Sequence, residues 1–484
     1  MKNLKNTYSE LPKEFHRSIN PTPVSKPEFL CLNRELANEL FIDTADENKL
    51  LQYFSGNEVP GDSSTIAMAY AGHQFGNFVP QLGDGRAILL GELYDKEKKL
   101  NDIQLKGSGV TAFSRQGDGR SAIGPVIREF ILSEAMHAMN IPTTRALAAV
   151  YTGENVSREA PVKGGILTRV SNSLIRVGTF EFFRARQDLE NLKVLADFTI
   201  NRLYPKISDE ENKYLLLFEA ISEKQSTLVS KWMSIGFIHG VMNTDNFSVS
   251  GETIDYGPCA FMEAYNPDTV FSSIDRHGRY KYSNQPKIAL WNLSCLAGCL
   301  LPIIEGNESE KEEAIRESLG NFSKDINSKI NRTMTAKVGL EETKESNDLV
   351  KELLSIMHKN SADFTLTFRS LSSAIGSKDD DFLVCFSNAE EPKDWLKKWK
   401  KMIHQKSEKT ENTIHNLNSI NPIYIPRNHL IERAIREYEE ENTHAIMDQI
   451  LRVTQKPYLE QEDMEDFAIP AKDGEQVTQT FCGT

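Results

Sequence analysis

Residues 239–257 read His-Gly-Val-Met-Asn-Thr-Asp-Asn-Phe-Ser-Val-Ser-Gly-Glu-Thr-Ile-Asp-Tyr-Gly, and this stretch decides how the rest of the chain is interpreted. It places Asp245, Asn246 and Asp255 on loops beside short apolar segments. Carboxylate and amide oxygens are the ligands that Mg²⁺ takes beside substrate phosphates. The stretch therefore has the composition of a magnesium–nucleotide site.

The spacing within this stretch follows that of protein kinases, which carry H-R-D-x-x-x-x-N and then D-F-G, with the Asn and the second Asp on metal ions. His239 lies seven residues before Asn246, and Asp255 begins Asp-Tyr-Gly where D-F-G would stand. The position of the kinase base is Val241, which cannot accept a proton, and the nearest carboxylate is Asp245. The alternative is that Asp245 and Asn246 only close a turn, since both residue types satisfy turn backbones.

Composition indicates a globular protein of about two or three domains. Charged residues make up 26% and hydrophobic residues 39% of 484, and the net charge of −13 disfavours a nucleic acid partner. The longest apolar candidate, residues 293–304, is shorter than the roughly 18–20 residues of a membrane span. The N-terminus signals neither export nor organelle import. We therefore expect a cytoplasmic monomer with neither membrane nor nucleic acid as partner.

The six cysteines are widely scattered, which favours a reducing compartment. Cys295 and Cys299 share a helix face, but no His or third Cys lies at ligand spacing, so we interpret them as part of a packed apolar helix. A lone His73 in the tight loop expected over residues 70–76 is interpreted as a satisfied structural residue.

One segment is basic within this acidic chain. From Lys106 to Arg186 there are eleven Lys plus Arg against six Asp plus Glu. Arg169 and Arg176 are flanked by apolar residues, and a buried arginine is costly unless an anion pairs with it. The segment could therefore hold a small polyanion, the alternative being a solvated basic face.

Glycine-rich loops in the first third of the chain are candidates for phosphate contact. Gly83, Gly85 and Arg86 precede an apolar strand, where Asp84-Gly85 is a hairpin signal and the glycines would also let backbone N–H groups approach phosphates. Residues 102–106 alternate as a half-buried strand that ends in Lys106, followed by Gly107. A second glycine-rich, charged loop spans residues 115–120.

The pattern then predicts a helix over residues 126–140, strands over 144–151 and 164–170, and helices over 180–236 with a break at Tyr204-Pro205. A kinase needs a helix glutamate to hold its strand lysine, and Glu129 or Glu134 could serve. Further helices are expected over residues 305–317, 342–358 and 429–441. The order predicts an α+β chain with a two-lobed, protein-kinase-like fold, an N-terminal arm and an additional C-terminal helical region.

We expect four parts: an N-terminal arm (1–60), a nucleotide-binding lobe of strands and a helix (61–180), a lobe with the catalytic and metal loops (181–300), and a helical extension with a flexible tail (301–484).

The ordered set of motifs resembles the selenoprotein O (YdiU) family of kinase-like proteins. The motifs run from Asn-Pro-Thr-Pro-Val at residues 20–24 through Tyr-Ala-Gly-His-Gln-Phe-Gly, Gln-Leu-Gly-Asp-Gly-Arg, Leu-Lys-Gly-Ser-Gly, Gly-Asp-Gly-Arg and His-Gly-Val-Met-Asn-Thr-Asp-Asn to Asp-Tyr-Gly-Pro and a tail cysteine. They cover nearly the whole chain. The resemblance implies transfer of AMP from ATP to Ser, Thr or Tyr hydroxyls of proteins, the enzyme itself included.

The family is thought to bind ATP flipped relative to kinases, so that the α-phosphate faces the acceptor. Carried over by motif, Asp245 is the base, and Asn246 with Asp255 holds Mg²⁺, with Mn²⁺ as the alternative ion. The nucleotide-contact set is Gly83, Gly85, Arg86, Lys106, Asp118, Gly119, Arg169 and Arg176, with Glu129 holding Lys106.

Some relatives form a disulfide between the tail and a cysteine near the active site. The corresponding residues 270–273 contain no cysteine, and Cys259 is the local candidate to pair with Cys482. Two other functions stay open: a phosphotransferase acting on a small molecule or a protein, and a non-catalytic ATP-binding pseudokinase.

Overall fold

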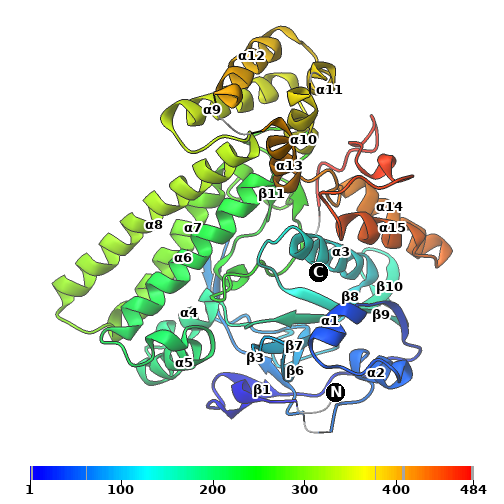
Figure 1. The fold of residues 1–484 in the computed structure, drawn as a ribbon. Helices are drawn as coiled ribbons and strands as arrows, with labels where there is room; N and C mark the ends of the chain where they lie inside the picture. Colours follow the sequence, from blue (N-terminus) through cyan, green and yellow to red (C-terminus); the bar gives the residue numbers. More distant parts are fainter. Residues whose placement is uncertain (2–3, 62, 377, 406–408, 481–484) are drawn as a thin grey trace.

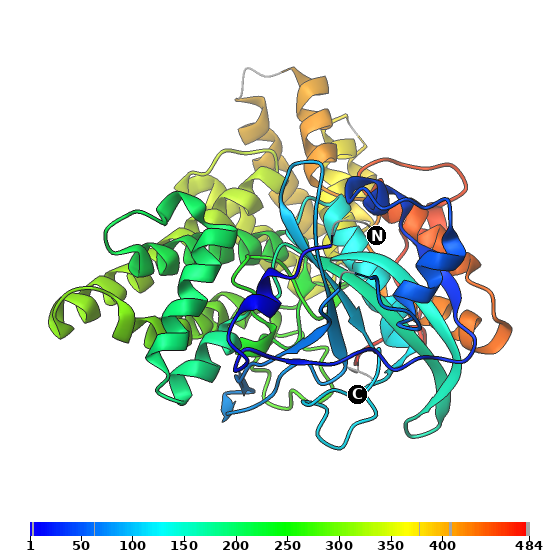
Figure 2. The ribbon, with the colours of Figure 1, turned by 90° about the horizontal axis from the view of Figure 1, so that it is seen from below.

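The computed structural model describes residues 1, 4–61, 63–376, 378–405 and 409–480, and it has an α+β fold. Strands and their covering helices form one half, and long helices form the other half and an upper layer (Figure 1). Cys482 lies outside the described residues. The turned view in Figure 2 shows the strands between the long helices on one side and the C-terminal helices on the other.

The main sheet has eight strands in the order β1-β3-β6-β7-β10-β9-β2, with β8 paired to β10. All of its strand pairings are antiparallel. Its strands are β1 (His16–Ser18), β2 (Glu28–Leu32), β3 (Ile66–Met68), β6 (Ala87–Tyr94), β7 (Leu100–Lys106), β8 (Ser121–Ala122), β9 (Arg145–Ser157) and β10 (Pro161–Ser171).

Both faces of this sheet are covered by apolar side chains. Ile103 and Leu105 of β7 pack in one cluster together with residues of α1 (Arg34–Glu39) and α2 (Glu47–Phe54), which cap one face. Leu89 of β6 and Leu167 of β10 point to the other cluster, which holds α3. The first 60 residues therefore supply two strands and two helices to this half of the molecule.

The strand predictions are confirmed, but the hairpin turn predicted at Asp84-Gly85 is wrong. The chain between β3 and β6 makes an excursion that carries a small sheet of β4 (Gly72–Gln74) and β5 (Asn77–Val79), where a loop was expected. The Asp84 carboxylate is buried and accepts hydrogen bonds from Met68 N and from Gln104 Nε2, each at 3.1 Å. Asp84 therefore ties two strands together from inside and does not turn the chain.

Helix α3 (Ile123–Ala138) confirms the helix expected over 126–140, with Pro125 in its first turn as anticipated. Asn140 follows with φ 58°, a left-handed conformation that ends the helix. The helix is buried on nearly every side because the sheet lies under it and C-terminal helices pack on it. Arg128 of α3 donates to Asn428 at 3.1 Å, which fixes the C-terminal region against it.

The helical half begins with α4 (Val177–Ala185), α5 (Leu189–Leu203) and α6 (Lys213–Ser234), and the expected break falls at the 3₁₀ helix η2 (Pro205–Ile207). Helices α6, α7 (Gln285–Leu300) and α8 (Glu308–Lys337) lie side by side (Figure 1). The expected helix over 305–317 is thus the first part of a helix of 30 residues.

The chain between α6 and α7 carries the short elements of the candidate site. They are the two-stranded sheet of β11 (Phe237–Ile238) and β12 (Ala260–Phe261), and the 3₁₀ helices η3 (Thr244–Asn246) and η4 (Tyr282–Asn284).

The C-terminal helices confirm the two remaining predictions, since α9 covers 342–358 except for its first two residues and α14 covers all of 429–441. The remaining elements are η1 (Thr7–Glu10), η5 (Leu301–Ile303), α9 (Lys344–Asn360), α10 (Phe364–Ile375), α11 (Asp379–Leu383), α12 (Glu390–His404), α13 (Thr410–Ile420), α14 (Asn428–Glu441), α15 (Ala445–Thr454) and η6 (Glu465–Phe467).

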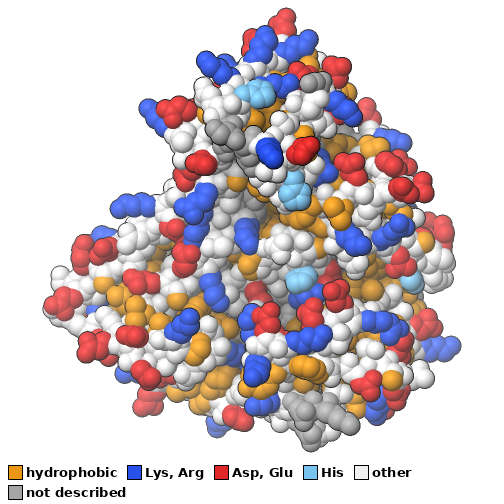
Figure 3. Space-filling view, in the orientation of Figure 1, with side chains coloured by type: hydrophobic (Ala, Val, Ile, Leu, Met, Phe, Trp, Pro, Cys, Tyr) orange, Lys and Arg blue, Asp and Glu red, His pale blue; other side chains and the backbone are white. Residues whose placement is uncertain are grey.

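The apolar run that appeared too short in the sequence belongs to a longer helical stretch. Among the described residues, Tyr282–Ile303 (22 residues, hydropathy 1.3) is the one stretch long and apolar enough to cross a membrane by length and composition. Half of the most apolar part of this stretch is buried inside the protein, where α4, α6 and α8 pack on α7. Such packing is typical of a core helix. On the face shown in Figure 3, acidic and basic side chains are interspersed.

Candidate functional site

A cavity of about 930 Å³ lies against the sheet, α3 and the loops around η3. All of the residues predicted for the nucleotide, the base and the metal line it. They are Gly83, Gly85, Arg86, Lys106, Asp118, Gly119, Glu129, Arg169, Arg176, Asp245, Asn246 and Asp255. The fold thus brings together residues from positions 83 to 255 of the chain, while their roles in binding and catalysis stay predictions.

Lys106 at the end of β7 contacts the helix glutamate that the sequence left open. Its Nζ lies 2.6 Å from Glu129 Oε2 and 2.9 Å from Asp255 Oδ1. Glu134 points elsewhere, since its Oε2 lies 2.8 Å from Nη2 of Arg145. Of the two candidates on α3, Glu129 therefore holds the lysine.

Asp255 collects three cations around one carboxylate. Its Oδ1 accepts from Lys106 at 2.9 Å and from Arg169 at 2.5 Å, and its Oδ2 accepts from Arg176 at 3.2 Å. Burial opposes its ionisation, but Arg169, Lys106 and Arg176 together hold the pKa of Asp255 well below its usual range. Its backbone has φ 63°, which non-glycine residues seldom adopt and which is often found at functional sites.

Arg169 and Arg176, which lie in apolar segments of the sequence, have the anionic partners expected for buried arginines. Arg169 is 2% exposed and lies 2.6 Å from Glu129 and 2.5 Å from Asp255. Arg176 pairs with Asp255, and its guanidinium lies 4.5 Å from the ring centroid of Tyr70. Each buried arginine therefore has a carboxylate of the protein as its partner, and both arginines also line the cavity.

Asp245 lies on η3 across the cavity from β7, and one of its oxygens is unsatisfied. Its Oδ1 is buried without a hydrogen-bond partner among the described residues, whereas Oδ2 accepts from Gln74 Nε2 at 3.3 Å. Burial raises the pKa of Asp245 to about 6, and Arg176 partly opposes this. A buried oxygen without a partner in the chain needs a hydrogen-bond donor from elsewhere, which water or a ligand hydroxyl can supply.

Two glycines make room for Asp245. A Cβ on Gly72 would lie 2.6 Å from Asp245 Oδ1, and one on Gly178 would lie 2.1 Å from the carbonyl oxygen of Ala71 and 3.3 Å from Asp245 Cα. Side chains at these positions would displace the carboxylate or the strand beside it. Glycine is therefore required here by close approach.

The alternative that Asp245 and Asn246 only close a turn holds in part for Asn246. Asn246 N donates to Asn243 O at 2.9 Å and Asn246 Nδ2 donates to Val241 O at 3.1 Å. The side chain of Asp245 accepts instead from Gln74, which lies outside this turn. His239 supports the loop from behind, because its buried Nε2 donates to Ile254 O at 2.9 Å, one residue before Asp255.

The predicted glycine loops line the cavity, but packing already accounts for these glycines. At φ 83°, a Cβ on Gly83 would lie 2.3 Å from the Phe113 ring, and at φ 67°, one on Gly119 would lie 2.1 Å from Gly109. Asp118 beside it pairs with Arg158 at 2.8 Å. Arg86 lines the cavity, and no ion pair within the described chain neutralises it.

Sequence reasoning missed several residues of this site, and they share no local signal. Tyr70 and Gln74 lie within a quoted motif but carry no spacing that assigns a role, and Arg158 comes from the far end of β9. Asp84, which was read as a turn residue, is buried beside the cations, and burial raises its pKa to about 6. These residues are recognised only in the folded structure, where they lie close to Asp245, Arg176 or Asp118.

The oxygens present fit a magnesium ion. Mg²⁺ takes carboxylate and carbonyl-type oxygens together with substrate phosphates. Asn246 keeps its amide oxygen for a ligand because its Nδ2 makes the loop contact to Val241. The Asp255 carboxylate offers about four lone-pair directions, and the three cations occupy three of them. One direction thus remains for an ion.

Comparison with known proteins gives one consistent result. A family model described as protein adenylyltransferase SelO matches residues 1–455. A protein nucleotidyltransferase YdiU of Maridesulfovibrio salexigens is 47% identical over 480 residues, covering 99% of this chain and 98% of its own. The corresponding proteins of Bradyrhizobium diazoefficiens and Rhizobium meliloti are 49% and 47% identical, each covering 99% of this chain and 98% and 99% of their own.

Proposed function

The chain belongs to the protein adenylyltransferase SelO family, and from that premise we propose that it transfers AMP from ATP to Ser, Thr or Tyr hydroxyls of proteins, itself included. It is a nucleotidyltransferase by family, so a nucleotide substrate is implied. One observation carries the finer proposal. Asp245 has a buried, unpartnered oxygen in the same cavity as Lys106, Arg169 and Arg176.

In this proposal the two halves of the molecule are the lobes of a kinase-like fold. Residues 61–180 supply the strands and α3, residues 181–300 supply the loops with Asp245 and Asp255, and residues 301–484 are an extension. The arm of residues 1–60 joins the strand lobe. The proposed protein is a cytoplasmic monomer that uses neither membrane nor nucleic acid, and light scattering of the purified chain tests the monomer.

The nucleotide enters with its β- and γ-phosphates toward the buried cations. Lys106, Arg169 and Arg176 neutralise pyrophosphate as it leaves, since fixed positive groups aimed at developing charge lower a barrier most in a site that excludes water. Arg86, Gly83, Gly85, Asp118 and Gly119 line the rest of the nucleotide's path. The cavity of about 930 Å³ is of the size that small ligands occupy.

Asn246 and Asp255 would hold Mg²⁺, or Mn²⁺, when ATP is bound. The ion would neutralise part of the phosphate charge, which is what a divalent ion supplies in this chemistry. The Asp255 carboxylate also orients Lys106, Arg169 and Arg176.

The transfer step uses Asp245 as the base. The acceptor hydroxyl oxygen forms a bond to the α-phosphorus, and the bond from that phosphorus to the oxygen that bridges to the β-phosphate breaks. The hydroxyl proton passes to Asp245, and pyrophosphate leaves with the electron pair of the broken bond. The pKa of about 6 leaves Asp245 largely ionised at neutral pH and basic enough to accept a proton.

Intact-mass measurement tests the proposal. The full chain is incubated with ATP and Mg²⁺, and the expected result is a gain of AMP mass with release of pyrophosphate. Asp245→Asn is expected to lower the rate by about 10²–10⁴-fold, with ATP binding retained. The matched control is Asp363→Asn, which removes the charge of a partly buried carboxylate paired with Arg427 outside the cavity.

The other functions give different masses. A phosphate-sized gain with ADP as product would assign a phosphotransferase. ATP binding without any covalent gain, on the chain or on added protein substrates, would assign a binding protein. Either result overturns the proposal.

A further inference from the structure

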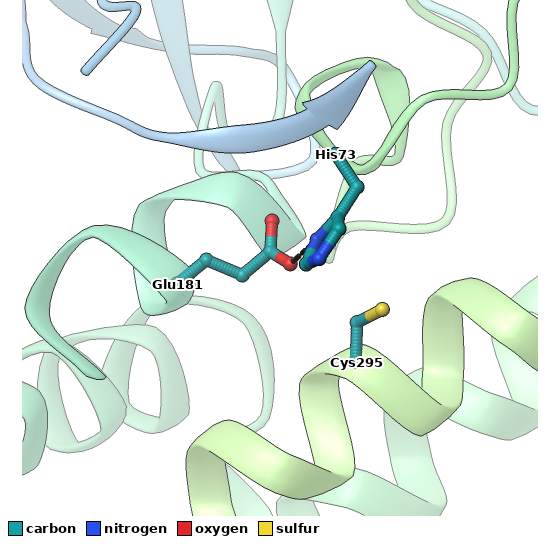
Figure 4. Close-up of side chains that lie close together, drawn as sticks. All are labelled: His73, Glu181 and Cys295. Carbon is teal, nitrogen blue, oxygen red and sulfur yellow. Dashed lines mark hydrogen bonds and ion pairs between the residues drawn. The ribbon is translucent and has the colours of Figure 1, made fainter. Parts of the chain in front are cut away.

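Three side chains from distant parts of the chain meet beside the base loop (Figure 4). His73 comes from β4, Glu181 from α4 and Cys295 from α7, and one ligand atom from each lies within 4.8 Å of the others. Sequence spacing assigned no partner to Cys295. The predicted packed helix is confirmed as α7, and the folded chain adds a His and a Glu beside Cys295 that sequence spacing did not indicate.

The cluster is partly reachable from outside. The side chain of Glu181 is 4% exposed, that of His73 is 27% exposed, and Cys295 is half-buried. The rings of Phe78 and Trp291 flank His73, with centroids 4.9 and 5.2 Å from that of the imidazole. None of the three clustered side chains lines the nucleotide cavity, so the cluster is a separate place.

We infer that His73, Glu181 and Cys295 form a binding site for one divalent transition-metal ion of the zinc class. Imidazole nitrogen, thiolate sulfur and carboxylate oxygen are the donors that Zn²⁺ takes, with three protein ligands and an open fourth position in non-structural sites. A thiolate disfavours Mg²⁺ and Ca²⁺, which select oxygen ligands.

The charges around the cluster point to the same class of ion. Glu181 supplies one negative charge, and Cys295 supplies a second when the bound ion displaces its proton, since burial and Glu181 raise the pKa of the free thiol to about 12. The guanidinium of Arg279, 4.5 Å from the ring centroid of Trp291, acts on Cys295 and opposes any cation. The charge of Arg279 therefore weakens the binding of an ion that is held only by electrostatic attraction. An ion that forms strong bonds to nitrogen and sulfur ligands still binds.

A hydrogen bond joins two of the three proposed ligands. His73 Nδ1 lies 2.5 Å from Glu181 Oε1. Two donors on one tetrahedral Zn²⁺ at about 2.0–2.1 Å stand roughly 3.3 Å apart. His73 and Glu181 must therefore move slightly apart when both bind the ion.

The cluster is connected to the base by one residue. Thr244 Oγ1 donates to Glu181 Oε2 and accepts from His73 N at 2.6 Å, and Thr244 directly precedes Asp245. An ion that draws Glu181 toward itself changes the support of η3. A bound ion thus changes the rate of transfer, a consequence that rests on the proposed function.

Cobalt spectroscopy of the full chain tests the site without reference to activity. Co²⁺ is titrated into metal-free protein, and the expected result is one equivalent bound with a thiolate-to-cobalt charge-transfer band that Zn²⁺ abolishes by displacement. Cys295→Ser removes the band. Cys299→Ser, one turn further along the same helix and outside the cluster, keeps it.

A second variant distinguishes loss of a metal ligand from a folding defect in Cys295→Ser. His73→Gln is expected to weaken Zn²⁺ binding at least about tenfold, which is the lower end of what loss of even a supporting partner costs a metal site. Absence of the band in the wild-type chain, its persistence in Cys295→Ser, or unchanged Zn²⁺ affinity in His73→Gln overturns the inference. Failure of AMP transfer leaves these readouts unaffected, so the two proposals fail separately.

Discussion

Arg176 donates from Nη1 to the backbone carbonyl oxygen of Asp245 at 2.8 Å, so a cation of the phosphate region is tied directly to the main chain of the proposed base. The same Nη1 donates to Asp255 Oδ2 at 3.2 Å. One planar guanidinium therefore links the loop of Asp245, the proposed base, to the loop of Asp255, the proposed metal ligand.

Substitution of Arg176 tests whether its two hydrogen bonds, to the loops of Asp245 and Asp255, matter for the transfer. Arg176→Lys keeps the charge but loses the fixed geometry, because an ammonium on a flexible stem cannot reproduce a planar donor set. We expect the transfer rate to fall by about 10²-fold, the scale of a misplacement near 1 Å, measured as initial pyrophosphate release. Arg184→Lys, whose guanidinium contacts Gly298 O far from the cavity, serves as control and is expected to keep wild-type rates.

Substitutions of the two glutamates of α3 are expected to differ, one lowering the transfer rate and the other lowering the stability of the fold. Glu129→Gln weakens the hold on Lys106 and Arg169 and is expected to lower the transfer rate. Glu134→Gln disturbs the pair with Arg145 and is expected to lower the free energy of unfolding by about 1–3 kcal/mol, the cost of an unsatisfied buried group. Its rate per folded molecule should stay unchanged. Urea denaturation and initial rates check both, and a reversed pattern would reassign the lysine's partner.

The pH dependence of transfer should reflect Asp245. Because the base must be ionised, kcat/KM is expected to rise with pH through about 6 and then level off, since burial raises the pKa of Asp245 to about 6. Gln74 donates to the ionised carboxylate and so lowers this pKa. Gln74→Leu should therefore move the rising limb to higher pH. A rate profile between about pH 5 and 9 measures it, and a shift to lower pH contradicts the assignment.

The close approach at Gly72 gives a steric test. In Gly72→Ala the new methyl would meet Asp245 Oδ1 at 2.6 Å, so the carboxylate must move, and we expect a loss of transfer of about 10²-fold or more with the fold retained. Gly298→Ala is the control, because nothing lies within 4 Å of its Cβ position and alanine favours a helix by about 0.5–1 kcal/mol. Wild-type activity in Gly72→Ala would show that Asp245 is not held where the transfer needs it.

Much of the secondary structure was predictable because its signals are local. Alternation over 102–106 predicted the strand ending in Lys106, and helical periodicity with a proline in the first turn predicted α3. The turn predicted at Asp84 failed because the same Asp-Gly pair is compatible with a buried carboxylate that binds two strands. Sequence patterns report which backbone a residue favours but not whether its side chain finds partners elsewhere.

The sequence by itself determined the candidate set for the nucleotide site. Lys106, Asn246 and Asp255 were recognisable because metal and phosphate chemistry restricts residue types and because loop spacing preserves their order, whereas Glu129 and Asp245 were assigned by the family resemblance. That these residues meet in one cavity follows from the folded chain.

Only the tertiary structure decided which partners these residues have. Glu129 and not Glu134 reaches Lys106, Gly72 leaves space for Asp245, and His73, Glu181 and Cys295 converge across three elements. The physical reason is separation along the chain, since His73 and Glu181 stand 108 residues apart. The periodicity of the sequence carries no information on residues so far apart. His73, Glu181 and Cys295 meet because β4 packs on α4 and α4 packs on α7.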